Sequence, residues 1–281
     1  MAVPPLRALV GAGHDVALVV TRPDRRRGRG PRTSPSPVEQ AAVELGLAVE
    51  HDVRAVATVG VELGVVVAYG RLIPADVLDA VPMLNLHFSL LPRWRGAAPL
   101  ERAILAGDET SGVCVMGVEE TLDTGPVYAR AEVVVGEQPL ATLQEELAEL
   151  GAGMLVELLA AGRRGLPAPE PQRGEPTYAE KLAPDELRLR WDEPATQLAR
   201  VVRLGRAFAF FRGRRLRVLA ASATASTTPA GDAPGVLSPS GRVATGDGVL
   251  VLERVQQEGR APMGADEWLR GVRPQPGEML E

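Results

Sequence analysis

The chain has 281 residues, enough for two ordinary domains that each bury a core, and we expect two. A formal net charge of −5 argues against a protein that coats nucleic acid indiscriminately. The single cysteine, Cys114, excludes a disulfide framework, and its apolar neighbours predict a buried side chain rather than a nucleophile. Neither a leader-like segment nor an apolar run of roughly 20 residues is found, so we expect a cytoplasmic protein with no membrane partner.

The first hundred residues alternate between helical and extended patterns, which is typical of a parallel α/β sheet. The expected helices cover 5–12, 38–45 and 74–80, and the expected strands cover 15–21, 63–68 and 83–88. Segment 22–37 is rich in Arg, Gly, Pro and Ser and has no apolar periodicity. It predicts a long loop that is either functional or disordered.

Three further elements complete the first part of the chain. Pro99 suits the first turn of a helix that ends at Gly107. Strands are expected at 113–118 and 127–135, on either side of a loop at 119–126. Thr142 and Glu145 have the spacing of a capping box, which predicts a long helix that closes at Gly162.

The character of the sequence changes after residue 165. Four prolines in 166–177 predict an extended linker. A helix at 191–204 and strands at 216–221, 242–245 and 249–255 follow, with a low-complexity loop at 223–233. Gly246-Asp247-Gly248 predicts a tight turn between the last two strands. This part of the chain predicts a small, mostly β domain.

Nearly all of the 31 positive charges are arginines, since Lys181 is the single lysine, and the arginines cluster. One cluster lies at 22–32 and another at 200–217, with no acidic residue from 200 to 231. Such runs are usually solvated faces. Guanidinium groups also suit phosphates, and two basic patches on an acidic protein would fit a polyanion that spans both.

Asn85 and His87 end a predicted strand, at the edge where α/β sheets place their ligands. Alternation along the strand sends both side chains to one side. An Asn amide can donate to a developing oxyanion, and a His can move a proton or, when charged, stabilise that oxyanion. The alternative is that both side chains only satisfy loop backbone.

Asp123 lies in the sequence Leu122-Asp123-Thr124-Gly125, within a predicted loop between two strands. A carboxylate there can fix the tautomer of a histidine and hold its charge. Alternatively, Asp123 only caps the amides of a turn. We exclude an aspartic protease, which needs two such aspartates, because one copy is present and the surrounding α/β pattern is wrong.

Two other features bear on ligands. Segment 89–96 combines apolar residues, a proline and a glycine directly after the Asn85 strand, and such a loop can wrap an apolar heterocycle. We expect no metal site, because His14 and His51 lack partners at ligand spacing and Cys114 is predicted to be buried.

Taken together, these segments resemble the methionyl-tRNA formyltransferase family over nearly the whole chain. The stretch from Asn85 to Pro99 resembles the strand and loop that hold its catalytic Asn and His and the folate, and Leu122-Asp123-Thr124-Gly125 resembles the loop with its catalytic Asp. The resemblance implies catalysis by Asn85, His87 and Asp123. It implies folate binding by the following residues: Tyr69, Gly70, Ser89, Leu90, Leu91 and Pro92.

The acceptor is implied by other segments, because folate-dependent formyltransferases with different acceptors share the Asn, His and Asp set. The loop from Thr21 to Val38 resembles the one that this family inserts to reach the acceptor end of tRNA, and the part from Ala244 to Met263 resembles its tRNA-binding barrel. The implied tRNA contacts are Arg22, Arg25, Arg26, Arg27, Arg29, Arg32, Arg214 and Arg215.

The implied architecture is an α/β, Rossmann-like formyltransferase domain at 1–165, a linker at 166–185 and a C-terminal, OB-like β-barrel domain at 186–281. The family has a strand and a Gly-Thr-Pro turn before the helix that here starts near Val3, and that central strand is missing from this sequence. Its loss would leave unpaired backbone groups on both neighbours, at about 1–3 kcal/mol for each buried group. We expect the true start to lie upstream of Met1.

The implied function is transfer of the formyl group of 10-formyltetrahydrofolate to the amino group of methionyl-initiator tRNA, for translation initiation. We expect Asn85 and a protonated His87 to stabilise the oxyanion, Asp123 to orient His87, and the enzyme to be a monomer without a metal. The alternatives are formyl transfer to an amino sugar, hydrolysis of the formylfolate, or a truncated, non-catalytic tRNA-binding remnant.

Overall fold

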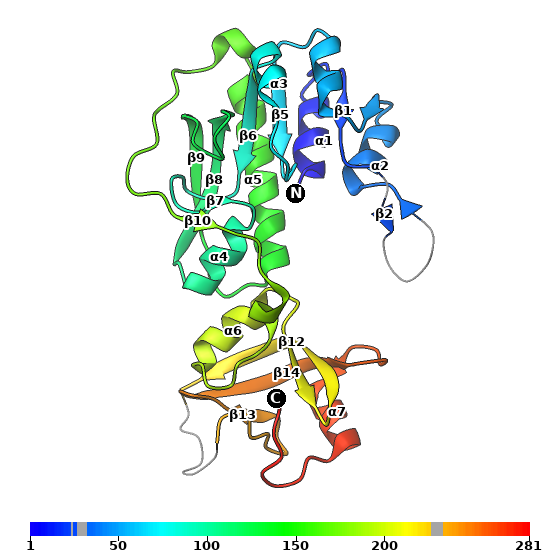
Figure 1. Ribbon diagram of the computed structural model, residues 1–281, viewed down its shortest axis with the longest axis vertical. Helices are drawn as coiled ribbons and strands as arrows, with labels where there is room; N and C mark the ends of the chain where they lie inside the picture. The colour runs from blue at the N-terminus through cyan, green and yellow to red at the C-terminus, as the bar shows by residue number, and fades with distance from the viewer. Residues whose placement is uncertain (24, 27–32, 226–232) are drawn as a thin grey trace. The chain divides into compact units, whose positions relative to one another are not determined.

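The computed structural model of the chain describes residues 1–23, 25–26, 33–225 and 233–281 (Figure 1). The chain divides into two compact units, which we describe separately. The first unit comprises Met1–Leu100, Thr110–Val134 and Gln144–Glu180, and the second comprises Glu101–Glu109, Val135–Leu143 and Lys181–Glu281. None of the helices in the described ranges combines the length and apolarity that a membrane span requires.

The elements up to residue 180 follow the predicted alternation. The helices are α1 (Val3–Gly11), α2 (Pro37–Glu44), α3 (Ala75–Ala80), α4 (Pro99–Ala106) and α5 (Leu140–Leu159), with short 3-10 helices at Val53–Thr58 and Arg163–Gly165. The strands are β1 (Val19–Val20), β2 (Arg25–Arg26), β3 (Thr33–Ser34), β4 (Val49–Glu50), β5 (Gly64–Val67), β6 (Met83–His87), β7 (Arg95–Gly96), β8 (Thr110–Gly117), β9 (Val127–Val134) and β10 (Tyr178–Ala179).

A four-stranded sheet of order β5-β6-β8-β9 forms the centre of the first unit. β5 and β6 are parallel, as expected for the first hundred residues, whereas β8 and β9, which follow later in the chain, pair in antiparallel fashion, β8 with β6 and β9 with β8. A direct loop joins β8 to β9, and such a short connection permits only antiparallel pairing. Helix α5 packs closely on this sheet, because a Cβ atom on Gly151 would lie 2.7 Å from Cδ2 of Leu86 (Figure 1).

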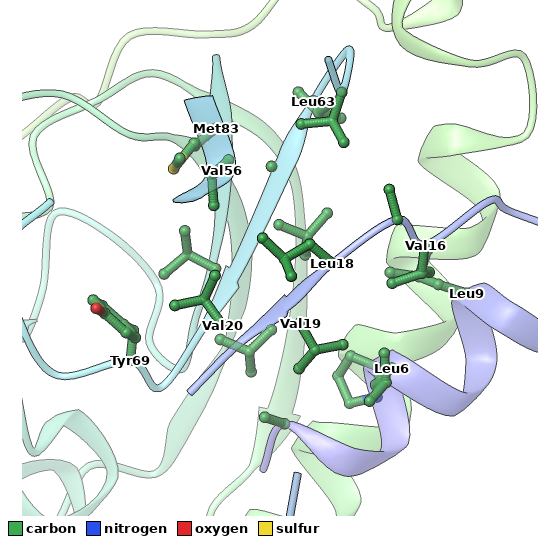
Figure 2. A pocket seen from close by; sticks show the side chains of 18 of the residues that line it. Leu6, Leu9, Val16, Leu18, Val19, Val20, Val56, Leu63, Tyr69 and Met83 are labelled. Carbon is green, nitrogen blue, oxygen red and sulfur yellow. The ribbon is translucent and has the colours of Figure 1, made fainter. Parts of the chain in front are cut away.

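A second, two-stranded sheet, β1-β4, is separated from the first by a cavity (Figure 2). Within the described residues, no ladder joins β1 to β5. The cavity has a volume of about 850 Å³, and its lining includes residues 16–20 on one side and 63–67 on the other. The expected strand at 15–21 is correspondingly reduced to Val19–Val20.

Among the residues that the structure describes, β1 pairs only with β4 and β5 only with β6, so both have an edge without a strand partner on the side of the cavity. The N–H groups of Val19 and Thr21 donate to the carbonyl oxygens of Ala48, directly before β4, and of Glu50 in β4, so the backbone groups of Val20 point the other way, towards the cavity. On β5, all four residues are half-buried, whereas four of the five residues of β6 are buried.

The long loop expected at 22–37 contains a short hairpin. β2 pairs with β3 in antiparallel register, Arg25 with Ser34 and Arg26 with Thr33. Residues 24 and 27–32 lie outside the described residues, and with them the predicted contacts Arg27, Arg29 and Arg32. The hairpin leads into α2, which begins where the hydroxyl of Ser36 accepts a hydrogen bond from the backbone of Glu39 at 3.0 Å.

The capping box predicted at Thr142 and Glu145 is wrong. Helix α5 already begins at Leu140, so Thr142 lies inside its first turn. Pro139 directly precedes the helix, and its carbonyl oxygen accepts the backbone N–H of Leu143 at 3.2 Å.

Most of the proline-rich segment expected as a linker at 166–185 is bound to the first unit. Glu170 and Val127 exchange two backbone hydrogen bonds of 2.8 and 2.7 Å. Further along, β10 pairs in parallel with β7, aligning Tyr178 with Arg95 and Ala179 with Gly96. The first unit therefore continues to Glu180, and the second resumes at Lys181.

The second unit is built on a curled antiparallel sheet of order β11-β12-β14-β13, with β15 on β14. Its elements are α6 (Ala195–Arg203), β11 (Phe208–Phe211), β12 (Arg214–Thr224), β13 (Arg242–Ala244), β14 (Val249–Gln257), β15 (Met263–Gly264) and α7 (Ala265–Val272), after a 3-10 helix at Pro184–Leu187. Trp191, Phe211 and Trp268 belong to its core, and the two rings of Phe211 and Trp268 meet edge to face at 5.1 Å.

The predicted strands of this unit are present, but the helix boundaries and some further elements differ from the prediction. The helix expected at 191–204 begins at Ala195, after Pro194, and Trp191 is a buried residue outside it. β11, β15 and α7 were not predicted. The turn at Gly246-Asp247-Gly248 is confirmed, with the hydroxyl of Thr245 donating to the carbonyl of Gly248 at 2.8 Å. Residues 226–232, within the expected loop at 223–233, lie outside the described residues.

Candidate active site

Strand β6 carries Asn85 and His87 towards its carboxyl end. The two side chains are two residues apart and therefore lie on the same face of the sheet. Asn85 is half-buried, and His87 is 5% exposed. β5 runs parallel to β6 and pairs Val67 with Leu86, so the loop after β5 begins beside the end of β6. Ligands of α/β sheets bind at this edge.

The loop between β8 and β9 brings Asp123 to the same place. Asp123 has a left-handed backbone conformation, with φ of 53°, which is uncommon outside glycine and must be held by its surroundings. Gly125 is required by close contact, because a Cβ atom there would lie 1.9 Å from the carbonyl oxygen of Gly117. The Asp-Thr-Gly sequence thus lets the loop fold back tightly on the end of β8.

The structure brings Asn85, His87 and Asp123 together. Nδ2 of Asn85 donates to Oδ1 of Asp123 at 3.4 Å, and Nδ1 of His87 lies 3.6 Å from Oδ2 of Asp123. The backbone N–H of Gly96 donates to the same Oδ2 at 2.8 Å. The aspartate therefore faces both β6 side chains while a backbone amide fixes its orientation.

The surroundings of His87 decide its charge. Its Nε2 lies 3.0 Å from the carbonyl oxygen of Trp94, which can only accept, so Nε2 carries the hydrogen. Burial lowers the pKa of His87 below its ordinary value of 6.5, and the negative charge of Asp123 offsets this only in part. This lowering favours the neutral imidazole near pH 7, and Nδ1 lies on the side of Asp123. The expectation that a protonated His87 stabilises the oxyanion stays a prediction.

Two of the predicted folate-binding residues in the loop after β6 are buried in the protein interior. Ser89 is fully buried, and its hydroxyl donates to the carbonyl of Arg93 at 2.6 Å. Leu91 is 2% exposed and packs with Cys114 and Met116. Leu90 and Pro92 are half-buried, and the Leu91–Pro92 peptide bond is cis. Ser89 and Leu91 thus shape this loop from within, while Leu90 and Pro92 are the more accessible pair.

Cys114 itself is buried, and burial raises the pKa of its thiol. This confirms the expected buried side chain. A thiol with a raised pKa is a poor nucleophile at neutral pH.

Tyr69 and Gly70 lie in the loop after β5, and Arg22 contacts both. One guanidinium nitrogen of Arg22, Nη2, donates to the carbonyl oxygens of Tyr69 and Gly70, each at 3.0 Å. Tyr69 is half-buried and lines the cavity of Figure 2. Arg22 thus links the end of β1 to the loop after β5. The clustering of arginines in the sequence did not indicate this contact.

The remaining predicted tRNA contacts are only partly described. The backbones of Arg25 and Arg26 form β2. In the second unit, Arg214 and Arg215 begin β12 and are exposed, and the guanidinium of Arg215 stacks 3.8 Å over the ring of Phe208. Phe208 also meets Phe210 edge to face at 5.8 Å. This outer face of the sheet combines aromatic rings with cations.

Sequence reasoning missed the groups that hold the site. Gly96, Trp94 and Gln172 contact Asp123 or His87, and two of these contacts are made by backbone atoms. Hydrogen bonds made by backbone atoms cannot be inferred from residue type. Gln172 lies in the proline-rich segment, 49 residues from Asp123, where no local pattern indicates a role.

Both parts of the chain match known families. Residues 6–159 match the family described as "Formyl transferase", and residues 181–273 match "Formyl transferase, C-terminal domain". The methionyl-tRNA formyltransferase of Jannaschia sp. (strain CCS1) is 42% identical over 295 residues, covering 99% of this chain and 96% of that protein. The chain belongs to the methionyl-tRNA formyltransferase family. The relative from Rhizorhabdus wittichii is 44% identical over 285 residues, covering 96% of this chain and 92% of that protein.

Solved structures of formyltransferases share the fold. The methionyl-tRNA formyltransferase from Clostridium thermocellum is similar with a TM-score of 0.52 at 18% identity, covering 67% of this chain and 88% of that chain. An N-formyltransferase from Helicobacter canadensis, solved with folinic acid and dTDP-3-aminofucose, has a TM-score of 0.66 at 12% identity, covering 89% and 95%. These likenesses concern the fold alone. They confirm the predicted Rossmann-like formyltransferase domain followed by a smaller β domain.

Proposed function

We propose that this chain is a cytoplasmic enzyme that transfers the formyl group of 10-formyltetrahydrofolate to the α-amino group of methionyl-initiator tRNA. The observation that carries the proposal is the convergence of Asn85, His87 and Asp123 at one sheet edge, in a chain about 40% identical to methionyl-tRNA formyltransferases over nearly its full length. The product, formylmethionyl-tRNA, serves translation initiation.

The geometry supports a division of roles among the three side chains. The amide nitrogen of Asn85 has a second hydrogen besides the one directed at Asp123, and it donates that hydrogen to the oxyanion. Neutral His87 is a general base through Nδ1. Asp123 stabilises the imidazolium that forms, since its charge raises the pKa of His87.

The reaction then proceeds through a tetrahedral intermediate. The methionyl amino nitrogen attacks the formyl carbon on N10 of the folate, and the carbonyl oxygen becomes an oxyanion. Nδ1 of His87 takes the proton that the attacking nitrogen loses. The proton then passes to N10, the carbon–N10 bond breaks, and formylmethionyl-tRNA and tetrahydrofolate are released. In this scheme His87 is charged during turnover, and not in the resting enzyme.

The two substrates have separate places in the proposal. The folate is bound at the carboxyl edge of β5 and β6, by Tyr69, Gly70, Leu90 and Pro92, with Ser89 and Leu91 supporting their loop from within. The tRNA is bound by the segment at 22–32 and by Arg214 and Arg215 of the second unit. The basic clusters support this assignment, and so does the face formed by Phe208, Phe210 and Arg215 (the Phe208 face), because arginines and aromatic rings suit phosphates and bases.

One assay separates this function from its rivals. The chain is incubated with 10-formyltetrahydrofolate and, in parallel, with charged initiator tRNA, with a nucleotide-linked amino sugar, or with no acceptor. We expect formylmethionyl-tRNA in the first reaction and little product in the others. A formylated sugar or free formate as the main product would contradict the acceptor, and tRNA binding without any product would contradict the activity.

A further inference from the structure

Gln172 connects two segments of the candidate active site by its side-chain amide. Its Nε2 donates to the carbonyl oxygens of Asp123 and Gly125, at 2.9 and 2.8 Å. Its Oε1 accepts two hydrogen bonds from the guanidinium of Arg95, at 3.1 and 2.7 Å. Both amide hydrogens and both oxygen lone pairs are therefore used, and this set of partners is compatible with only one orientation of the amide.

The backbone on both sides of Gln172, at Asp123 and at Arg95, explains why its hydrogen bonds matter for the site. Asp123 has a φ of 53°, and a left-handed non-glycine residue persists only where its surroundings hold it. Arg95 is followed by Gly96, whose N–H holds the Asp123 carboxylate at 2.8 Å. β7 therefore holds Asp123 in two ways. Gly96 donates directly to the carboxylate of Asp123. Arg95 binds Gln172, which donates to the backbone carbonyl of Asp123.

The segment that carries Gln172 is itself anchored beside the site. Glu170 pairs with Val127 at the start of β9, and β10 pairs with β7. Gln172 thus lies between two fixed points, in a segment that the sequence indicates only as an extended linker. Its amide has the right donors for two carbonyl oxygens that no other described hydrogen bond satisfies.

We propose that Gln172 is a positioning residue for the reaction, which holds the Asp123 carboxylate at its working distance from His87 and Asn85. The expected effect on kcat rests on the proposed function. The expected displacement of Asp123 rests on the structure alone. Gln172 touches no reacting atom in this account. It acts by fixing the loop from Asp123 to Gly125.

The substitution Gln172→Glu tests the proposal with almost no change in shape. A glutamate keeps the acceptor for Arg95 but has no hydrogens to donate, so its carboxylate repels the carbonyl oxygens of Asp123 and Gly125. We expect kcat for formyl transfer to fall by about 10- to 100-fold, because small displacements of a catalytic group cost this much. The KM values for both substrates should change little, and the melting temperature should fall only modestly, because the lost hydrogen bonds lie in a half-buried surface segment. Gln40→Glu, at an exposed position on α2, is the control for the added charge.

A double substitution separates positioning from general damage. In a chain that already carries Asp123→Asn, adding Gln172→Glu should lower kcat by less than about twofold, because the group that Gln172 positions is no longer functional. A full additional loss in that background, or an unchanged kcat for Gln172→Glu alone, would overturn the proposal.

A readout without turnover keeps this test independent of the proposed function. The imidazole NMR resonances of His87 should shift in Gln172→Glu and stay unchanged in Gln40→Glu, because only the first displaces Asp123. Absence of formyl transfer by the unaltered chain would refute the proposed function and leave this shift as the test. Unchanged His87 resonances in Gln172→Glu would overturn the positioning role.

Discussion

The Nδ1 atom of His87 lies 3.6 Å from Oδ2 of Asp123, while its Nε2 is bound to the carbonyl of Trp94. This arrangement presents the lone pair of a neutral imidazole next to a carboxylate. Such a pair is unfavourable until a proton arrives, and favourable once the imidazolium has formed. The site is thus suited to accept one proton during a reaction.

The pKa of His87 is the first quantity to measure. Because burial lowers it, we expect an NMR titration of the ring to give a midpoint below 6.5. The unfolded chain then binds the proton more readily than the folded one below pH 6.5, so the free energy of unfolding should fall as the pH falls from there.

The variant Asp123→Asn provides the control for this titration. It removes the charge that raises the pKa, and so the midpoint should move lower still. A midpoint above 6.5 in the unaltered protein would show that the Asp123 charge outweighs burial, and would favour a protonated resting His87.

The close contact at Gly125 predicts a marked loss of stability on substitution. In Gly125→Ala the new methyl group would meet the carbonyl of Gly117, so the loop must move, at a cost of about 1–3 kcal/mol and with a large loss of activity. Gly153→Ala is the matched control, because that exposed glycine of α5 has no atom within 4 Å of the added carbon. It should stabilise the protein by about 0.5–1 kcal/mol. Equal effects in urea unfolding would contradict the packing described.

The cavity between β1 and β5 predicts that two leucines differ in how much their substitution lowers the free energy of unfolding. Leu84 on β6 is 2% exposed, and Leu84→Ala should cost about 2–5 kcal/mol of unfolding free energy. Leu18 faces the cavity beside β1 and is half-buried, so Leu18→Ala should cost less than about 1.5 kcal/mol. A comparable cost at both positions would mean that the cavity is filled in solution.

The Phe208 face predicts a salt-dependent role in tRNA binding. Arg214→Gln and Arg215→Gln should each weaken binding and reduce the slope of log K against log salt by about one, as expected for the loss of a phosphate contact. Arg7→Gln is the control, since Arg7 is engaged with Glu44 on the surface of the first unit. Unchanged slopes for Arg214 and Arg215 would remove this face from the proposed tRNA site.

The sequence indicates most of this architecture, for identifiable reasons. The strands around Asn85 and Cys114 are apolar runs, and helices α2 and α4 carry prolines in their first turns, so their positions follow from local chemistry. The residues Asn85, His87 and Asp123 are distinctive in their residue types. Their proximity follows from strand pairing, which the alternation of elements suggests but does not specify.

Other features could not be predicted, because they depend on partners distant in sequence. β11 is a short strand defined by its register with β12, and Gln172 has meaning only through Asp123, Gly125 and Arg95. The direction in which the pKa of His87 shifts depends on burial, which residue type does not reveal. Helix α5 starts at Leu140, directly after Pro139 and before the position that the capping box pattern indicates.

The most direct test of the central claim is the rate of formylmethionyl-tRNA formation from 10-formyltetrahydrofolate and charged initiator tRNA. It is to be measured for the unaltered chain and for His87→Ala, together with the affinity of each for the tRNA. We predict rapid formation by the unaltered chain, and a rate lower by about 10²–10⁴-fold in the variant at nearly unchanged tRNA affinity. Equal rates for the two proteins, or no product from the unaltered chain, would contradict this account.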